Sequence, residues 1–183
     1  FLHDKTDTPR IVIGFDTRHF SLEFMQIIAE VLSATGIKVI VTPDYTSTPE
    51  LSYFVRTYKS DLGIMITASH NPPEYNGIKV YGEDGSQLID EPSEALSKYI
   101  NAIEDVFSIE SKDFETAVKD GDVEYVSDEV KQAYRKEVTD FVGEIPKSDL
   151  SIVFSSLHGT SVPIVPELLE ALNFNQYSLV ESQ

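Results

Sequence analysis

The sequence contains no cysteine in its 183 residues. This absence excludes disulfide bonds, a thiolate nucleophile and any metal site built on thiolates. It also fits a reducing compartment, so we expect a cytoplasmic protein. No uninterrupted apolar run approaches the roughly 20 residues needed to cross a bilayer, and residues 1–10 are too polar for a secretory signal. No membrane partner is therefore expected.

Basic residues are scarce as well. The 14 lysines and arginines stand against 31 aspartates and glutamates, which gives a formal net charge of −17. This balance excludes a nucleic-acid partner, because phosphate backbones require clustered positive charge, and it disfavours an anionic membrane surface for the same reason. Ten of the acidic residues, but only Lys112 and Lys119, lie in the segment 104–129. Such a run is typical of a solvated face or connection, so we expect this segment to be peripheral.

The hydrophobic pattern of the N-terminal half alternates between strands and helices. Short, nearly all-apolar runs at residues 10–15, 38–42 and 62–67 predict buried strands. Helical spacing follows the first two runs, starting at Ser21 and at Thr48, and Thr48 is the expected N-cap of its helix. This alternation predicts a parallel sheet with crossover helices.

The later sequence predicts further elements and a second unit. The expected helices are at residues 92–106, 128–142 and 163–172, and the expected strands are at residues 78–81, 151–154 and 177–180. Residues 143–146 indicate a boundary, after which the strand–helix pattern restarts. We therefore predict an α/β fold with a mixed, mainly parallel sheet: a first domain at residues 1–147 and the beginning of a second, similar α/β domain at residues 148–183. The chain is expected to be a piece of a longer, multidomain protein.

The residues best suited to chemistry lie at residues 67–81, directly after the third predicted strand. Ligands of such sheets bind at the carboxyl ends of the strands. Ser69, on a loop stiffened by two prolines and accompanied by His70 and Lys79, could act as a nucleophile with acid–base partners. The same residues also fit a polar turn whose serine and asparagine side chains satisfy backbone groups, and composition alone favours that structural interpretation.

Two stretches of this segment, Thr67-Ala-Ser-His-Asn-Pro72 and Tyr75-Asn-Gly-Ile-Lys79, closely resemble the phosphoserine signature of the α-D-phosphohexomutases. That family includes the phosphoglucomutases and phosphomannomutases. Three other stretches resemble the family in the same order, namely Ile13-Gly-Phe-Asp-Thr-Arg18, Thr48-Pro-Glu50 and Leu157-His-Gly-Thr160. The resemblance therefore extends from residue 10 to the end of the chain.

The resemblance implies a role for each residue of the segment. Ser69 would carry the transferable phosphoryl group, and its phosphate would be one ligand of an essential Mg²⁺ ion. Lys79 would be the general base or acid for the sugar hydroxyl proton, and His70 would position or protonate the reacting oxygens. Arg18 would either steady the serine loop or form a structural ion pair at the strand end, and both alternatives stay open. These roles suit phosphoryl transfer, which depends on positioning and charge neutralisation.

The implied activity is that of an isomerase acting as an intramolecular phosphotransferase. It would interconvert hexose 1-phosphate and hexose 6-phosphate, with glucose as the expected sugar, through a sugar bisphosphate intermediate that also activates the enzyme. Mannose, glucosamine and pentose phosphates are alternative substrates, and a non-catalytic sugar-phosphate-binding paralogue is an alternative function. The chain alone is expected to be inactive, because the aspartate ligands of the metal are expected beyond its end. The sequence leaves the oligomeric state open.

Other candidate sites are set aside. Asp120-Gly-Asp122 only partly resembles the family's aspartate-rich metal loop and precedes the second domain, so we expect it to be an exposed turn into a strand. His158 fits a family loop and is assigned no catalytic role. His3 and His19 lack the spaced partners of a zinc site, and the chain has neither a P-loop nor a Gly-x-Gly-x-x-Gly fingerprint.

Overall fold

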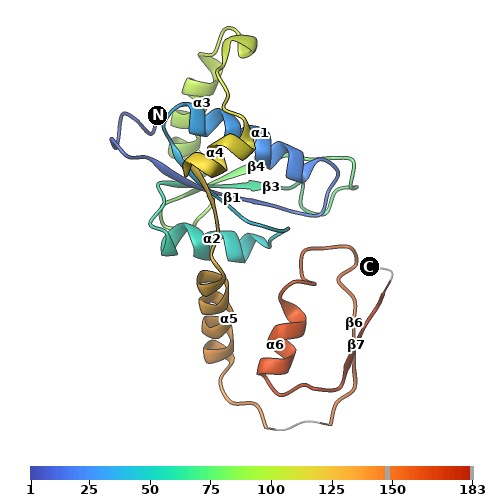
Figure 1. Cartoon of the computed structure of the whole chain (residues 1–183). Coiled ribbons are helices and arrows are strands. Elements are labelled where there is room, and N and C mark those ends of the chain that lie inside the picture. The colour runs from blue at the N-terminus through green and yellow to red at the C-terminus, as the bar shows by residue number, and fades with distance from the viewer. Residues whose placement is uncertain (147–148, 182–183) are drawn as a thin grey trace. The chain divides into compact units, whose positions relative to one another are not determined.

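The computed structural model describes residues 1–146 and 149–181 and divides into two compact units, Phe1–Val126 and Ser127–Gln183. Both units contain strands and helices (Figure 1), which confirms the predicted α/β class. Within the described ranges, no helix is long and apolar enough to span a membrane. The expected domain boundary at residues 147–148 lies outside the described residues, so the two-domain assignment stays a prediction.

The first unit is built on a five-stranded sheet with the order β4-β3-β1-β2-β5. Its strands are β1 (Arg10–Phe15), β2 (Lys38–Val41), β3 (Leu62–Ile66), β4 (Ile78–Gly82) and β5 (Val123–Tyr125). All neighbouring pairs are parallel except β3 and β4, which are antiparallel. Ile13 of the central strand β1 lies opposite Val41 on one side and Ile64 on the other. The predicted mixed, mainly parallel sheet is thereby confirmed.

Helices cover both faces of this sheet (Figure 1). They are α1 (Ser21–Ala34), α2 (Thr48–Thr57), α3 (Asp90–Asn101) and α4 (Phe114–Asp120). On one face, Met25 and Ala29 of α1 are buried against the strands. On the other face, Leu51 and Phe54 of α2 are fully buried. Because crossover helices return the chain to the start of the next strand, the parallel strands end together at one edge.

The N-terminus of α2 differs by one residue from the sequence-based expectation. Ser47, rather than Thr48, is the N-cap: its Oγ accepts a hydrogen bond from the Glu50 backbone N–H at 3.4 Å, and the Glu50 carboxylate accepts one from the Ser47 N–H at 3.0 Å. This reciprocal capping box satisfies two backbone donors that the helix itself cannot satisfy. Either hydroxyl residue could have capped the helix, and the Glu three residues after Ser47 decides between them.

The helix expected at residues 92–106 is shorter in the structure. It ends at Asn101, and a separate 3₁₀ turn follows at Val106–Ser108. Asp105 caps this turn, because its side chain accepts a hydrogen bond from the Phe107 N–H at 2.9 Å. This side-chain cap starts a separate turn at Val106, so the chain does not continue α3 there.

The acidic segment 104–129 has the expected solvated face, but it is more than a peripheral connection. It supplies α4, which packs against α1, and the edge strand β5, which pairs in parallel with β2. Phe114, Ala117 and Val123 are buried in the core. The carboxylates of the segment are exposed apart from the half-buried Asp122. The segment therefore has a charged outer face and an apolar inner face, and it completes the sheet and its helical layer.

The second unit is smaller. It comprises α5 (Asp128–Val142), β6 (Ile152–Phe154), α6 (Val165–Ala171) and β7 (Tyr177–Leu179). The two strands pair in parallel, with Val153 opposite Ser178. Arg135 of α5 forms an ion pair with Glu167 of α6 at 3.0 Å. The predicted strand–helix–strand pattern is confirmed for this part of the chain.

Candidate functional site

The carboxyl ends of β1 and β3 lie side by side and carry the candidate site. The Asp16 N–H donates a hydrogen bond to the Ile66 carbonyl at 3.1 Å, which joins the two strand ends. The Thr67 N–H donates to the Gly77 carbonyl at 2.9 Å, so residues 68–76 form a closed loop between β3 and β4. We call residues 68–76 the serine loop. This is the edge of the sheet where a parallel α/β fold is expected to bind its ligand.

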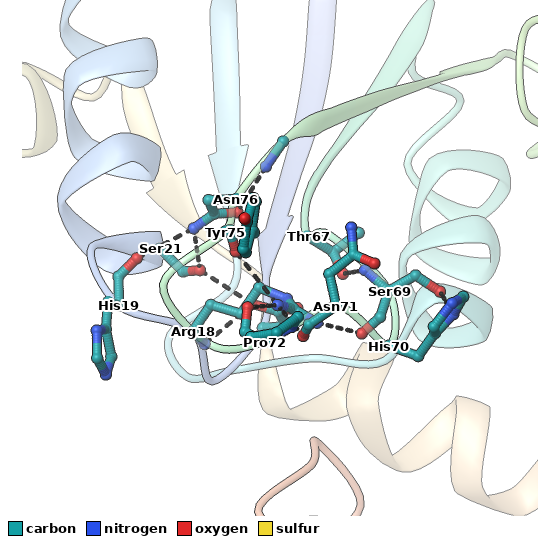
Figure 2. A network of polar contacts seen from close by, with 12 residues as sticks. Arg18, His19, Ser21, Thr67, Ser69, His70, Asn71, Pro72, Tyr75 and Asn76 are labelled. Atoms are coloured by element: carbon teal, nitrogen blue, oxygen red, sulfur yellow. Dashed lines mark hydrogen bonds and ion pairs between the residues drawn. The ribbon is translucent and has the colours of Figure 1, made fainter.

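Ser69 stands on the serine loop in a left-handed backbone conformation, with φ of 59°. Its N–H donates to Thr67 Oγ1 at 2.9 Å, and its Oγ lies 3.5 Å from His70 Nδ1 (Figure 2). Ser69 and His70 are both exposed. A left-handed conformation is uncommon for a residue other than glycine and is found at sites where surrounding contacts impose it. The loop thus presents a hydroxyl group next to an imidazole at the protein surface.

Arg18 makes the contacts that hold the serine loop. Its Nη1 donates to the carbonyls of Asn71, Pro72 and Tyr75 at 2.7, 2.8 and 3.2 Å (Figure 2). Its Nη2 donates to the Ser69 carbonyl. The sequence left two roles open for Arg18, and the structure contains both, because its Nε also forms an ion pair with Asp16 Oδ2 at 3.0 Å.

Asn76 ties the far end of the serine loop to the start of α1. Its Nδ2 donates to Ser21 Oγ at 2.8 Å and to the His19 carbonyl at 3.2 Å (Figure 2). Ser21 Oγ in turn donates to Asp16 Oδ1 at 3.0 Å. The sequence assigned no role to Asp16, Ser21 or Asn76, although Asn76 lies in the segment 67–81 that it singled out. A sequence signal also exists for Asp16, which directly follows a buried strand and stands two residues before Arg18.

Lys79 lies apart from Ser69 and His70. It is a half-buried residue of β4, two residues beyond Gly77, whose carbonyl closes the loop. Its neighbour on the same face, Tyr81, is buried, and burial raises the pKa of the Tyr81 hydroxyl above its ordinary value while a hydrogen bond with Thr48 lowers it. In residues 1–146 and 149–181, no hydrogen bond joins Lys79 to Ser69 or His70. The structure therefore brings two of the three predicted catalytic residues into contact and places the third, Lys79, in β4, outside the serine loop.

The described residues do not fit a magnesium site by themselves. Across these residues there is no group of three or more His, Cys, Asp or Glu side chains that could hold a metal ion, and Ser69 would supply a single ligand oxygen. Asp120 and Asp122 instead bind the Lys112 ammonium, at 2.8 and 2.5 Å. Gly121 between them, with φ of 80°, ends α4 and turns the chain into β5, as expected.

His158 lies in the second unit. It and Leu157 both have left-handed backbone conformations, with φ of 63° and 51°, in the turn that follows β6. Both side chains are exposed.

Comparison with known proteins gives consistent matches. Residues 1–107 match the sequence model of the family described as phosphoglucomutase/phosphomannomutase, alpha/beta/alpha domain I. A phosphoglucomutase of Staphylococcus epidermidis is 53% identical over 175 residues, which are 96% of this chain and 32% of that protein. A phosphoglucomutase of Staphylococcus aureus is 51% identical over 186 residues, covering all of this chain and 33% of that protein. The chain thus spans about a third of the length of the curated relatives it matches.

Solved structures share the fold. A putative phosphomannomutase from Thermus thermophilus aligns with a TM-score of 0.73 and 23% identity, over 95% of this chain and 37% of that one. The phosphoglucomutase pp63/parafusin of Paramecium aligns with a TM-score of 0.71 and 20% identity, over 96% of this chain and 37% of that one. At these identities the structural likeness supports the α/β architecture alone.

Proposed function

This chain belongs to the phosphoglucomutase/phosphomannomutase family, and from that premise we propose that it carries the phosphoserine site of an enzyme that interconverts hexose 1-phosphate and hexose 6-phosphate. The observation that carries the proposal is the serine loop, on which Ser69 Oγ lies 3.5 Å from His70 Nδ1 and the Ser69 carbonyl accepts a hydrogen bond from Arg18. Glucose is the proposed sugar, because the relatives at 51–53% identity are phosphoglucomutases. The substrate partner is a small sugar phosphate, and the proposed location is the cytoplasm.

Ser69 is the residue that exchanges phosphate in this proposal. Phosphorylated Ser69 gives its phosphoryl group to a free hydroxyl of the sugar monophosphate: the bond from phosphorus to Ser69 Oγ breaks, and a bond from phosphorus to the sugar oxygen forms. The hydroxyl proton passes to a base, and Ser69 Oγ takes up a proton. The resulting sugar bisphosphate then returns its other phosphate to Ser69, so the enzyme is restored and the phosphate has changed position on the sugar.

His70 and Lys79 are the proposed acid–base residues. His70 lies against the leaving Oγ and suits protonation of that oxygen. Lys79 is the proposed base or acid for the sugar hydroxyl. Lys79 lies in β4 and not on the serine loop, which suits a group that contacts the sugar and not Ser69.

A magnesium ion is part of the proposal, with the Ser69 phosphate as one ligand and carboxylates outside these residues as the others. When bound, such an ion neutralises charge on the phosphoryl oxygens. Because the chain spans about a third of its relatives' length, we propose that the sugar-binding parts also lie outside it. The 183-residue chain alone should then have no mutase activity, and measurable turnover by it would contradict this division of the site.

The direct test is phosphate on Ser69. A protein of the relatives' length that contains these residues is incubated with glucose 1,6-bisphosphate and Mg²⁺, and the Ser69 peptide is analysed by mass spectrometry. We expect one phosphate on Ser69 and mutase activity, both of which Ser69→Ala abolishes without loss of folding. Ser97→Ala, which alters an exposed serine of α3, is the matched control and should change neither. An unmodified Ser69 together with no mutase activity would favour a sugar-phosphate-binding paralogue without catalysis.

A further inference from the structure

Ser69 cannot hold its own conformation, because its left-handed backbone is unfavourable for a residue with a Cβ. Its side chain, moreover, is exposed, and within the described ranges its Oγ is hydrogen-bonded to no residue other than the neighbouring His70. The orientation of Ser69 Oγ must therefore come from groups that hold the backbone of the serine loop. Three such groups, Asp16, Ser21 and the Arg18 side chain, are buried between the carboxyl end of β1 and the start of α1.

A closed set of hydrogen bonds joins these groups, and we call it the Asp16 network: Asp16, Arg18, Ser21 and Asn76. Asp16 is its centre. One carboxylate oxygen accepts from Ser21 Oγ at 3.0 Å and from the Arg18 backbone N–H at 3.1 Å, and the other accepts from Arg18 Nε at 3.0 Å. Arg18 then reaches the carbonyls of the serine loop, and Ser21 reaches Asn76 at its end. Through Arg18 and Ser21, the single carboxylate of Asp16 thus supports both ends of the loop.

The burial of this network indicates that it supports the serine loop and does not bind the substrate. The Arg18 side chain is 8% exposed and the Asp16 side chain 11% exposed. An arginine that binds a phosphate group of the substrate would have to present its guanidinium to solvent, whereas this one is directed to Asp16 and to backbone carbonyls. Its charge is compensated within the protein. The expected effect of losing the network is therefore on the placement of Ser69 and not on substrate affinity.

We propose that Asp16 and Asn76 are positioning residues for Ser69, which act through Arg18 at the start of the serine loop and through Ser21 at its end. This inference rests on the proposed function, because it assigns a role in the use of Ser69 as the phosphoryl carrier. It adds that the reactivity of Ser69 is set by a carboxylate that touches neither Ser69 nor the substrate. A reacting atom displaced by about 1 Å can lose about a hundredfold in rate.

Two substitutions of nearly unchanged size test the proposal in the protein of the relatives' length. Asp16→Asn removes the charge that orients Arg18, and Asn76→Asp removes the amide donors to Ser21 and His19. We expect kcat for glucose 1-phosphate to fall about tenfold to a hundredfold with KM changed less than about threefold. Amide hydrogen exchange in residues 69–77 should become faster. In the double variant, the fall in kcat should be smaller than the product of the two single falls, because both substitutions act on one loop.

The matched control is Glu94→Gln. Glu94 is an exposed carboxylate of α3, outside the Asp16 network, and its loss should leave kcat and loop exchange unchanged. If Asp16→Asn fails to fold, Asn76→Asp alone carries the test, since it leaves the Asp16–Arg18 ion pair in place.

The proposal is overturned if the folded variants keep kcat within about twofold of the parent, or if KM rises while kcat and loop exchange stay constant, which would instead indicate contact with substrate. The proposed function has its own test: if Ser69→Ala remained active, that function would fail whatever the network variants did.

Discussion

Lys79 lies directly opposite Met65 in the antiparallel ladder of β3 and β4, on the face of the sheet that α2 covers. The face is fixed by Gly63, two residues before Met65, where a Cβ would meet Val55 and Leu51 of α2. Among the described residues, no carboxylate forms an ion pair with Lys79. This environment is compatible with the proposed role of Lys79 as the acid–base residue for the sugar hydroxyl.

Replacing Lys79 tests its assignment as the acid–base residue. Lys79→Met keeps the apolar stem and removes the ammonium, so in the protein of the relatives' length we expect kcat to fall by about a hundredfold or more. Lys98→Met, on the exposed face of α3, is the control and should have no effect. Steady-state mutase kinetics measure the loss of activity, and a thermal unfolding curve for each variant shows whether it is folded. Activity within about threefold of the parent for folded Lys79→Met would remove this residue from the reaction.

The acidic segment allows a sharp test of the core, because it contains two phenylalanines in opposite environments. Phe114, in the helix α4 that packs against α1, is 8% exposed, whereas Phe107 is 96% exposed. Phe114→Ala should lower the free energy of unfolding by about 3–5 kcal/mol, since it removes buried surface and leaves a cavity. Phe107→Ala should change it by less than about 0.5 kcal/mol. Urea denaturation measures both, and equal effects would contradict the placement of α4 in the core.

The parts of the fold that could be predicted from sequence are those with strong local periodicity. The strands β1, β2 and β3 are nearly all apolar, so burial on both faces is visible in the sequence itself. α4 was missed because it has only seven residues, three of them charged, so its two buried positions, Phe114 and Ala117, give no clear period. The serine loop could also be located from the sequence, because its polar residues directly follow the apolar run of β3.

The contacts that shape the site could not be predicted in the same way. Arg18 binds backbone carbonyls more than fifty positions away in the sequence. Carbonyl groups are present at every residue, so no residue type in the serine loop indicates which of them converge on one guanidinium. Ser21 likewise reads as the start of a helix and gains its second role only when Asn76 is brought beside it. Long-range polar contacts of this kind depend on the assembled sheet.

Two glycines have nearly equal backbone conformations but different surroundings. Substituting them by alanine therefore separates the cost of backbone strain from the cost of steric crowding. Gly85 and Gly36 have φ of 77° and 79°. A Cβ at Gly85 would lie 2.6 Å from Ser52 Oγ and 2.7 Å from the Ser52 carbonyl, whereas nothing lies within 4 Å of a Cβ at Gly36. Gly36→Ala should therefore cost about 1–2 kcal/mol for the left-handed conformation alone. Gly85→Ala should cost about 1–3 kcal/mol more, because the α2 backbone must move. Equal losses in a denaturation experiment would show that the turn at Gly85 relaxes freely.

Asp113 at the N-terminus of α4 gives a prediction for pH. Its carboxylate accepts hydrogen bonds from the Thr116 N–H at 3.0 Å and Oγ1 at 2.9 Å, and the backbone hydrogen bond above all lowers the pKa of Asp113 below its ordinary value of 3.8. A group whose pKa is lower in the folded state binds its proton more readily when unfolded. Its stabilising contribution is therefore present above pH 3.8 and is lost as the pH falls through the folded-state pKa.

Asp113→Asn isolates this contribution, because asparagine keeps an acceptor oxygen for the cap but does not titrate. The melting temperatures of the parent and the variant are compared between about pH 6 and about pH 2.5. We expect the parent to be the more stable protein at the upper end and this advantage to disappear at the lower end. Glu115→Gln, in the first turn of the same helix, measures the effect of removing one negative charge near the helix N-terminus. A difference between parent and Asp113→Asn that stays constant with pH would mean that the cap does not depend on the charge of Asp113.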